Sequence, residues 1–345
     1  GSGKLDRRNF QCAPVYEDLR EWLEEAEKLG ELRIVKGASW QKDIGMAAEA
    51  VIKEDNGPAV LFDDVPGCPP GFRVLMNVFA GKRRNMTLGF PEELTKVELS
   101  DACYETFVKD RKTIPPKIVQ DGPILENILT GDDIDLLKFP VPQWNRMDGG
   151  RYVLTYAGCV TKDPDTGRRN IGIRRCQIKG RNTTGILFAS PDRGGAIHYE
   201  KWKRLGKNMP AAIYIGADPV QYLVAPSRYG PDELAVAGGI RGEAVQMVKC
   251  ETVDIEVPAT AEIVIEGEIL IDGLDPEGPF GEFTGYMAGG RAAPVFKATC
   301  ITHRKDPIML GIISQFPPSE SSMIKRALLE AGLKKHLRDT LNIPG

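Results

Sequence analysis

Five prolines that fall between residues 115 and 142 divide this chain of 345 residues into two parts of different character. They are Pro115, Pro116, Pro123, Pro140 and Pro142. Proline fixes one backbone angle and has no N–H to donate, so neither a long helix nor a central strand can run through such a stretch. The chain is also longer than one ordinary domain. We therefore predict a linker and strap between two domains, over residues 115–150.

Signals for helices and strands alternate before the prolines. Residues 16–29 place Leu19, Trp22 and Leu23 on one face at helical spacing, and Gly30 follows where a C-terminal cap belongs. A second helix is expected at 44–52, and strands are expected at 32–35, 59–62 and 74–78. This alternation predicts an α/β domain over residues 1–114.

Strand signals dominate after the prolines. Short apolar runs bounded by turn residues predict strands at 152–160, 170–178, 211–215, 244–256, 261–271, 295–302 and 307–313. Strands of this kind are typical of a barrel or sandwich, which we expect over residues 151–316. Residues 317–345 carry an apolar stripe behind a capping serine and predict a helix that links to a further domain. The expected fold class is α+β.

Composition and charge exclude several classes of protein. Apolar residues make up 42% of the chain and charged residues 27%, which is typical of soluble globular proteins. A formal net charge of -3 gives no electrostatic reason to expect nucleic acid or a membrane as partner. No apolar run reaches the roughly 20 residues of a spanning helix. The 7 cysteines form no CxxC pair, so a disulfide framework or zinc ribbon is disfavoured and a cytoplasmic location is expected.

Two carboxylates lie five residues apart in the segment Glu277-Gly-Pro-Phe-Gly-Glu282. Glycine allows close backbone approach and proline stiffens the turn, so both acids are held by a restricted backbone. Carboxyl groups held in this way can differ in pKa, with one ionised and the other protonated. For an isolated pair at this spacing, a surface turn with two solvated acids is the commoner explanation.

The chain has only 3 histidines. His303 lies in a turn-like segment and His336 lies among lysines, so both are expected to be structural or solvated. His198 follows a glycine loop at residues 192–196. A lone histidine is more often structural than a ligand, so the residues around His198 must decide its role.

Five motifs follow one another along the second part of the chain. They are Asn-x-Gly-x-x-Arg at 170–175, Gly-Gly-x-x-His at 194–198, Gly-x-Asp-Pro at 216–219, Glu233 with Ala-Gly-x-x-Arg-Gly-Glu, and the Glu277 to Glu282 segment. In this order the motifs resemble those of the UbiD-like decarboxylases, and the resemblance covers nearly the whole chain. It implies a split β-barrel of the FMN-reductase type that binds prenylated FMN, with a flavin prenyltransferase as supplier of that cofactor.

The resemblance also implies a set of cofactor ligands. Asn170, His198 and Glu233 match the metal ligands of the family, which hold Mn2+ or Mg2+ against the cofactor phosphate. An amide oxygen, an imidazole and a carboxylate suit such an ion. A K+ site is implied near residues 225–227. The cofactor-binding positions implied in all are Asn170, Gly172, Ile173, Arg174, Arg175, Ile197, His198, Ser227 and Glu233.

The catalytic residues implied by the resemblance are Arg175, Glu277 and Glu282. Arg175 would pair with the substrate carboxylate in a two-pronged geometry, and Glu277 would hold Arg175 in place. Arg174 is the local rival, but adjacent strand residues point to opposite faces and the spacing of the family selects Arg175. Glu282 would protonate the carbon that carbon dioxide leaves. Phe283 would line the substrate pocket.

The activity implied is the reversible, non-oxidative decarboxylation of an unsaturated acid, aromatic, heteroaromatic or acrylic, through a covalent adduct with prenylated FMN. Phe283 and Ile197 favour a flat aromatic or heteroaromatic acid. The resemblance implies a C-terminal domain beyond the linking helix, which we expect this chain to lack, and the full-length protein is expected to be a homo-oligomer. The sequence leaves open the physiological direction of the reaction.

Two other classes of function stay open. One is a flavin-binding module without catalysis, either a non-catalytic subunit or a truncated scaffold, and the other is an ordinary FMN oxidoreductase on the same barrel. Neither would need Arg175, Glu277 and Glu282 together. No GxGxxG motif follows a strand to bind a nicotinamide. These features favour a carboxy-lyase.

Overall fold

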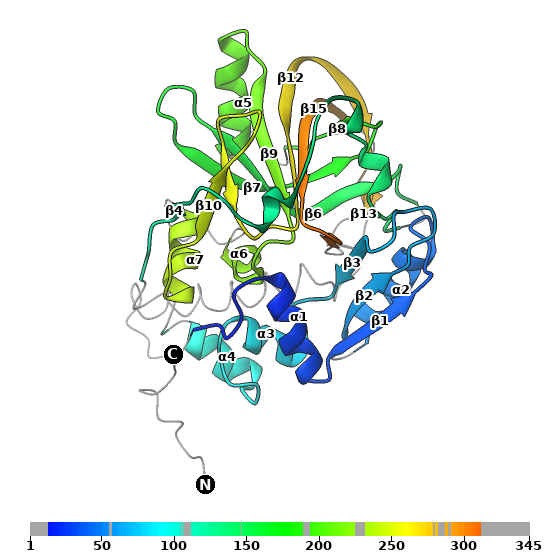
Figure 1. The fold of residues 1–345 in the computed structure, drawn as a ribbon, viewed down its shortest axis with the longest axis vertical. Helices are drawn as coiled ribbons and strands as arrows, with labels where there is room; N and C mark the ends of the chain where they lie inside the picture. The colour runs from blue at the N-terminus through cyan, green and yellow to red at the C-terminus, as the bar shows by residue number, and fades with distance from the viewer. Residues whose placement is uncertain are drawn as a thin grey trace.

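The structure is a computed structural model that describes residues 13–54, 57–103, 105, 112–145, 147–188, 194–224, 232–278, 280–281, 287–288 and 291–311. The elements before the proline-rich stretch gather at one end of the molecule, and the larger sheet with helix α5 (Gly194–Arg204) occupies the other end (Figure 1). The mixed helix and sheet content confirms the expected α+β class. The split-barrel architecture stays a prediction.

The N-terminal part is built on a sheet of four strands in the order β1-β2-β3-β16. Its strands are β1 (Leu32–Lys36), β2 (Ala59–Asp63), β3 (Arg73–Met76) and β16 (Ile308–Leu310). Strand β1 runs parallel to β2, β2 antiparallel to β3, and β3 parallel to β16. The helices of this part are α1 (Leu19–Lys28), α2 (Asp43–Ile52), α3 (Gly81–Thr87) and α4 (Lys96–Cys103). The predicted strand near residue 310 therefore completes the sheet of the N-terminal part.

Helix α1 forms where local signals agree. The Asp18 side chain accepts a hydrogen bond from the Glu21 N–H at 2.9 Å and so caps the first turn. The apolar face packs into the core, where Trp22 donates from its indole N–H to Thr87 Oγ1 at 2.9 Å. Gly30 takes a φ of 70°, which glycine adopts without strain, and ends the helix. The helix predicted over 16–29 is confirmed.

The larger sheet has seven strands. Its path is β5 (Asn127–Leu129), β15 (Arg291–His303), β12 (Ile263–Glu277), β9 (Met209–Ile215), β6 (Tyr152–Lys162) and β7 (Arg169–Gln177), and β8 (Thr183–Gly185) pairs with β15 off this path. All of these neighbours are antiparallel. Two isolated bridges, Arg175 with Leu187 and Ile178 with Thr184, join β7 to the segment around β8. The last part of β7 therefore lies beside both β6 and the β8 segment.

One predicted strand is divided in the structure. The run expected at 244–256 forms β10 (Gln246–Lys249) and β11 (Glu256–Pro258), which pair antiparallel with each other, and β10 also pairs with β4 (Lys117–Ile118). The buried carboxylate of Glu266 in β12 accepts from the N–H groups of Glu251 and Thr252 and so holds the turn. Because this partner comes from another strand, local sequence patterns do not reveal the turn.

Three helices of the second part were not expected from the sequence. They are α5, α6 (Pro219–Val224) and α7 (Glu233–Arg241). The segment read as a glycine loop at 192–196 is in part the first turn of α5, which begins at Gly194. Glycine has a low helix propensity, so the sequence pattern favoured a loop there. The remaining described elements are the 3-10 helices η2 (Pro123–Glu126), η3 (Gly131–Asp133) and η4 (Leu136–Lys138), and the two-stranded ribbon of β13 (Phe280–Gly281) and β14 (Met287–Ala288).

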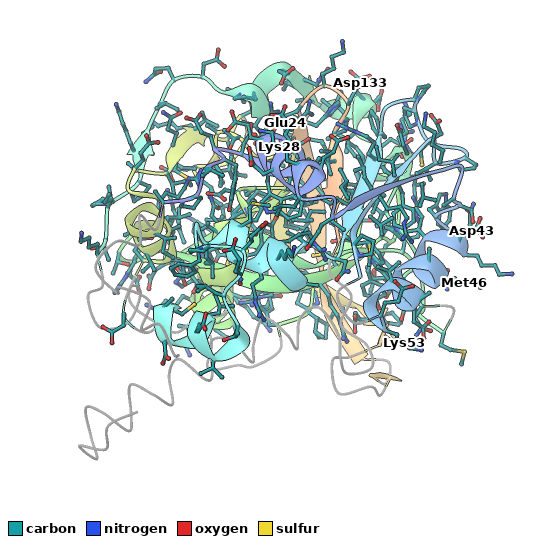
Figure 2. The ribbon with its side chains drawn as sticks, turned by 90° about the horizontal axis from the view of Figure 1, so that it is seen from below. Glu24, Lys28, Asp43, Met46, Lys53 and Asp133 are labelled. Carbon is teal, nitrogen blue, oxygen red and sulfur yellow. The ribbon has the colours of Figure 1, made fainter. Side chains whose placement is uncertain are left out.

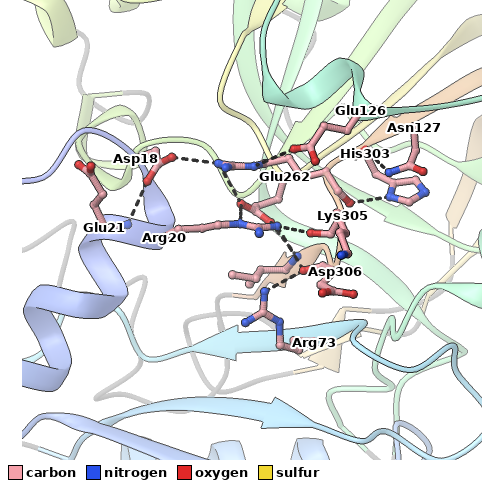
Figure 3. A network of polar contacts seen from close by, with 12 residues as sticks. Asp18, Arg20, Glu21, Arg73, Glu126, Asn127, Glu262, His303, Lys305 and Asp306 are labelled. Atoms are coloured by element: carbon pink, nitrogen blue, oxygen red, sulfur yellow. Dashed lines mark hydrogen bonds and ion pairs between the residues drawn. The ribbon is translucent and has the colours of Figure 1, made fainter.

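A buried carboxylate joins the N-terminal part to the larger sheet (Figure 3). Glu262, which precedes β12, is fully buried and accepts from Arg20 at 2.9 and 3.1 Å. It also accepts from the Ile308 N–H at 3.0 Å, at the start of β16. Arg304 lies 3.6 Å from the same carboxylate and 2.9 Å from Asp18. The start of α1 and the turn between β15 and β16 are thus held at one point.

The outer surface of the N-terminal part carries charged side chains together with exposed apolar ones, among them Ile34, Met46 and Val97. Asp43, Met46 and Lys53 project from α2 away from the rest of the chain (Figure 2). None of the described helices combines the length and the apolar character needed to cross a bilayer.

Candidate active site

Arg175 and Glu277 form a two-pronged ion pair between two strands. Arg175 Nε donates to Glu277 Oε1 at 2.8 Å, and Arg175 Nη2 donates to Glu277 Oε2 at 3.0 Å. The Glu277 side chain is 0% exposed and that of Arg175 is 10% exposed. Two parallel N–H···O bonds fix the rotation of the guanidinium as well as its position. The structure thus brings together the two residues that were predicted to contact each other.

Glu277 has a third donor that sequence reasoning missed. Tyr152, at the start of β6, donates from its hydroxyl to Glu277 Oε1 at 3.0 Å. Burial and the nearby Glu277 charge raise the pKa of Tyr152 well above its ordinary value, so the hydroxyl keeps its proton. The two residues are 125 positions apart, and no local pattern marks Tyr152 as more than the first residue of a predicted strand.

The opposite face of β7 points at helix α5. Asn170, Gly172 and Arg174 alternate along the strand, so their side chains share one face. A Cβ on Gly195 would lie 2.4 Å from Arg174 Nη2, and a Cβ on Gly194 would lie 2.4 Å from Asn170 Oδ1. A larger residue at either position would have to push these side-chain ends aside. The first turn of α5 therefore lies directly against the polar ends of Asn170 and Arg174.

Arg174 is buried but does not reach Glu277's side of the strand. Its guanidinium carbon lies 5.1 Å from the ring centroid of Phe188, a cation–π distance. A Cβ on Gly172 would come within 2.7 Å of Arg174 Nη1. The two neighbouring arginines thus serve opposite faces of β7, as their alternation predicts.

His198 lies in α5, one turn after the two glycines. The side chain is 7% exposed, and its Nδ1 lies 2.9 Å from Thr161 Oγ1. Thr161 is the register partner of Asn170 in the β6–β7 ladder, which puts His198 beside the Asn170 end of β7. Burial lowers the pKa of His198 and so favours the neutral imidazole. When Nδ1–H donates to Thr161, the Nε2 lone pair is the one that can bind a metal.

Glu233 begins α7. Asp232 caps this helix by accepting from the Leu234 N–H at 3.1 Å, and Arg169 Nη2 lies 3.3 Å from the other carboxylate oxygen of Asp232. Arg169 precedes Asn170 in β7, so the start of α7 is tied to the same strand end. Burial raises the pKa of Glu233. Asn170, His198 and Glu233 thus come from three elements linked at one end of β7.

Several predicted site residues lie outside the described part of the chain. They are Ser227, Glu282 and Phe283, together with the side chain of Ile173. Ile197 is described and is 43% exposed on α5. Among the described residues, no three His, Cys, Asp or Glu side chains gather into a metal-type cluster. The predicted metal ligands include only two residues of these types, His198 and Glu233, because the third ligand is Asn170.

Two family models match the chain. The 3-octaprenyl-4-hydroxybenzoate carboxy-lyase Rift-related domain (UbiD) matches residues 117–317, and the corresponding N-terminal domain (UbiD_N) matches residues 23–102. Together they cover both parts of the fold on either side of the proline-rich stretch.

Individual relatives are similar over most of the chain. A phenolic acid decarboxylase of Bacillus subtilis is 36% identical over 318 residues, which are 89% of this chain and 66% of the relative. The vanillic acid decarboxylase of Sedimentibacter hydroxybenzoicus in closed form is 32% identical, with a TM-score of 0.87 over 96% of this chain and 71% of that one. The UbiD-class enzyme HmfF from Pelotomaculum thermopropionicum, in an evolved dimeric form in complex with prFMN, is 32% identical, with a TM-score of 0.81 over 94% of this chain and 74% of that one.

The chain spans about two thirds of the length of the curated relatives that it matches. The match of the larger family model extends over more than half of the chain and includes Arg175, Glu277 and the three predicted metal ligands. The chain therefore belongs to the UbiD family of carboxy-lyases.

Proposed function

We propose that this protein catalyses the non-oxidative decarboxylation, or the reverse carboxylation, of an aromatic acid with prenylated FMN as cofactor. The observation that carries the proposal is the buried Arg175–Glu277 pair on the strand whose other face carries Asn170 and Arg174. A pure flavin-binding module has no need for an arginine oriented by a buried carboxylate. The names of the relatives, a phenolic and a vanillic acid decarboxylase, support an aromatic substrate.

Arg175 is proposed to bind the carboxylate of the substrate. A guanidinium has five N–H donors, so a group that gives two of them to Glu277 can also bind a second carboxylate. The negative charge of Glu277 balances the arginine while the site is empty of substrate and keeps its plane fixed. A lysine at this position would be a flexible point charge without that orientation.

The residues present fit the proposed cofactor and its metal. The glycines at the start of α5 let the backbone come close to Asn170 and Arg174, and a helix N-terminus with an arginine beside it suits a phosphate group. Asn170, neutral His198 and Glu233 are the nitrogen and oxygen donors that suit Mn2+ or Mg2+. Prenylated FMN would supply the electron sink that no side chain offers when carbon dioxide leaves. The K+ site near Ser227 stays part of the proposal.

Glu282 is proposed as the acid that protonates the carbon left by carbon dioxide, and Phe283 as a wall of the substrate pocket. Both follow Glu277 within six residues, on the same Gly/Pro-punctuated segment. Glu282→Gln is expected to abolish turnover while the cofactor stays bound. An active Glu282→Gln protein would remove Glu282 from this role.

The proposal includes the architecture and the partners. The β7–β8 bridges support a split barrel, because they connect the end strand β7 back toward β15 through β8. We propose the division into domains at 1–114, 115–150, 151–316 and 317–345, a homo-oligomer for the full-length protein, and a flavin prenyltransferase as cofactor supplier. An oligomer accords with the dimeric form named for one relative.

The test is an assay of carbon dioxide release after co-expression with a flavin prenyltransferase, with a panel of aromatic, heteroaromatic and acrylic acids. Arg175→Lys should reduce turnover by about 100-fold or more, because the bidentate contact is lost. Arg181→Lys is the matched control, since Arg181 is 59% exposed, lies 4.0 Å from Asp135 and donates to the exposed carbonyl of Asp132. Bound unmodified FMN and no release from any acid, in full-length protein, would refute the proposed function.

A further inference from the structure

The carboxylate of Glu277 is held more tightly than its contact with Arg175 alone requires. Oε1 accepts from both Arg175 Nε and Tyr152 Oη, while Oε2 accepts from Arg175 Nη2. A fully buried carboxylate needs several donors, because no water replaces the ones that it lacks. The Tyr152 hydroxyl is the donor that does not depend on the position of Arg175.

Tyr152 reaches Glu277 from a strand that is itself fixed. The residue is fully buried in β6 and is the register partner of Gln177 in β7. Its raised pKa keeps the phenol neutral, so it can donate to the carboxylate over the ordinary range of pH. Tyr152 therefore gives Glu277 Oε1 a second donor that comes from β6, the strand next to that of Arg175.

Gln177 fixes the backbone that follows Glu277. Its Nε2 donates to Gly149 O at 3.0 Å, and its Oε1 accepts from the Gly278 N–H at 3.2 Å. Gly278 has a φ of 90°, and a Cβ on Gly149 would come within 2.2 Å of Gly278 O, so the two glycines are packed against each other. The amide of Gln177 thus connects the end of the proline-rich strap to the segment after Glu277.

Three side chains at the end of β7 and just beyond it contact the segment around Glu277. Arg175 and Gln177 share a face of β7 and contact the carboxylate of Glu277 and the N–H of Gly278, and Lys179, two residues after the strand ends, contacts the carbonyl of Pro276. Lys179 is exposed, so its contact is the weakest of the three in water. The contacts of Arg175 and Gln177 are part-buried, so solvent competes with them less than with the contact of Lys179.

We propose that Tyr152 and Gln177 are positioning residues for Glu277 and, through it, for Arg175. Tyr152 fixes the carboxylate and Gln177 fixes the main chain behind it. The effect expected on substrate binding rests on the proposed function. The contacts of Tyr152 and Gln177 with Glu277 and Gly278 do not, since they join residues of this chain. Neither residue is expected to touch substrate or cofactor.

The first experiment is kinetic and uses Tyr152→Phe in protein loaded with prenylated FMN. Loss of one hydrogen bond to a buried charge should lower kcat/KM for vanillate, or for the best acid of the panel, by about tenfold. Most of this should appear in KM, because the substrate carboxylate is already bound in the ground state. The dissociation constant for FMN, measured by flavin fluorescence in the apoprotein, should stay within about twofold.

A double-mutant cycle separates positioning from a general loss of packing. If Tyr152 acts through Glu277, Tyr152→Phe should change kcat/KM by less than about twofold in a Glu277→Met background, which has no side-chain oxygen for the hydroxyl to bond. Tyr16→Phe is the control, because Tyr16 is also fully buried and donates to the Thr87 carbonyl at 2.8 Å, with Asp218 and Arg241 beside its hydroxyl rather than Glu277. An equal loss from Tyr152→Phe in both backgrounds would overturn the proposal.

The second experiment needs no turnover. Hydrogen exchange measured by mass spectrometry on the peptide that contains Gly278 should be about tenfold faster in Gln177→Met, because the Gly278 N–H loses its acceptor. Gln177→Glu keeps an oxygen for that N–H and should keep the protection. Unchanged exchange in Gln177→Met would refute the role of Gln177. If the wild-type protein releases no carbon dioxide from any acid, the proposed function fails, and the exchange result still decides this inference.

Discussion

Replacement of Glu277 by glutamine tests whether the Arg175–Glu277 pair is a buried ion pair. The substitution keeps the shape of the side chain but removes its charge and one of its two acceptor oxygens. The carboxylate now accepts three hydrogen bonds, at 2.8, 3.0 and 3.0 Å, and an amide places an NH2 group against at least one of those donors. Glu277→Gln therefore leaves a nearly buried guanidinium without its counter-charge.

The expected cost follows from this environment. Breaking a buried pair by removing one partner costs about 3 to 5 kcal/mol, and exposure of 10% at Arg175 leaves little solvent to screen it. We expect the free energy of unfolding to fall by about 3 kcal/mol. Replacing both partners, in Arg175→Met with Glu277→Gln, should cost less than the sum of the single changes, because no uncompensated charge stays buried.

The assay is urea unfolding followed by circular dichroism, with the midpoint and the m-value fitted together. Glu25→Gln is the control, since the Glu25–Lys28 pair has a similar length of 3.0 Å but side chains that are 27% and 70% exposed. This control should lose no more than about 0.5 kcal/mol. A loss below about 1 kcal/mol for Glu277→Gln, at an unchanged m-value, would show that the pair is solvated and would refute the reasoning.

Three further predictions concern other parts of the molecule. Gly195→Ala should weaken FMN binding about tenfold in a fluorescence titration, because the added Cβ would displace the Arg174 side chain. The free energy of unfolding should barely change, since alanine favours the helix, and an unchanged affinity for FMN would contradict the prediction. Glu262→Gln should lower the free energy of unfolding by about 3 kcal/mol in urea, because Arg20 and Arg304 lose a fully buried counter-charge; a neutral result would contradict it. Burial raises the pKa of Asp218 to about 6, so the folded state holds this proton more tightly than the unfolded state, and the stability that it contributes is lost as pH rises from about 4 through about 6. Wild-type protein should thus lose about 1 kcal/mol more stability than Asp218→Asn between about pH 5 and about pH 7.5, and an opposite sign would reject the shift.

Local patterns predicted the elements whose stability is local. Helix α1 has its cap at Asp18, its apolar face and its terminal Gly30 within one short segment, and the structure confirms it. Strands β6, β7 and β9 of the larger sheet were predicted to within two residues at each end, because alternation and turn residues are read along the chain. Strands β12 and β15 extend beyond the predicted bounds, and the short strands β5 and β8 were not predicted. The motifs identified the family and the pairing of Arg175 with Glu277.

Other features depended on residues that are distant in sequence. The turn between β10 and β11 is held by Glu266, and the glycines at the start of α5 leave room for the side chains of Asn170 and Arg174. Neither relation leaves a periodic signal. Propensity alone favoured a continuous strand in the first case and a loop in the second, and tertiary contacts reversed both preferences.

The candidate site shows the same division. The residue types that can bind a carboxylate, a phosphate or a metal were visible in the sequence at Arg175, Asn170 and His198. Tyr152 and Gln177 were not, since the residues that they hold at Glu277 and Gly278 lie more than 100 positions away. The functional group of a side chain is given by the residue itself, so the sequence shows it one residue at a time. The burial and the hydrogen-bond partners that strengthen the interactions of these groups exist only after β6, β7 and β12 have folded against one another.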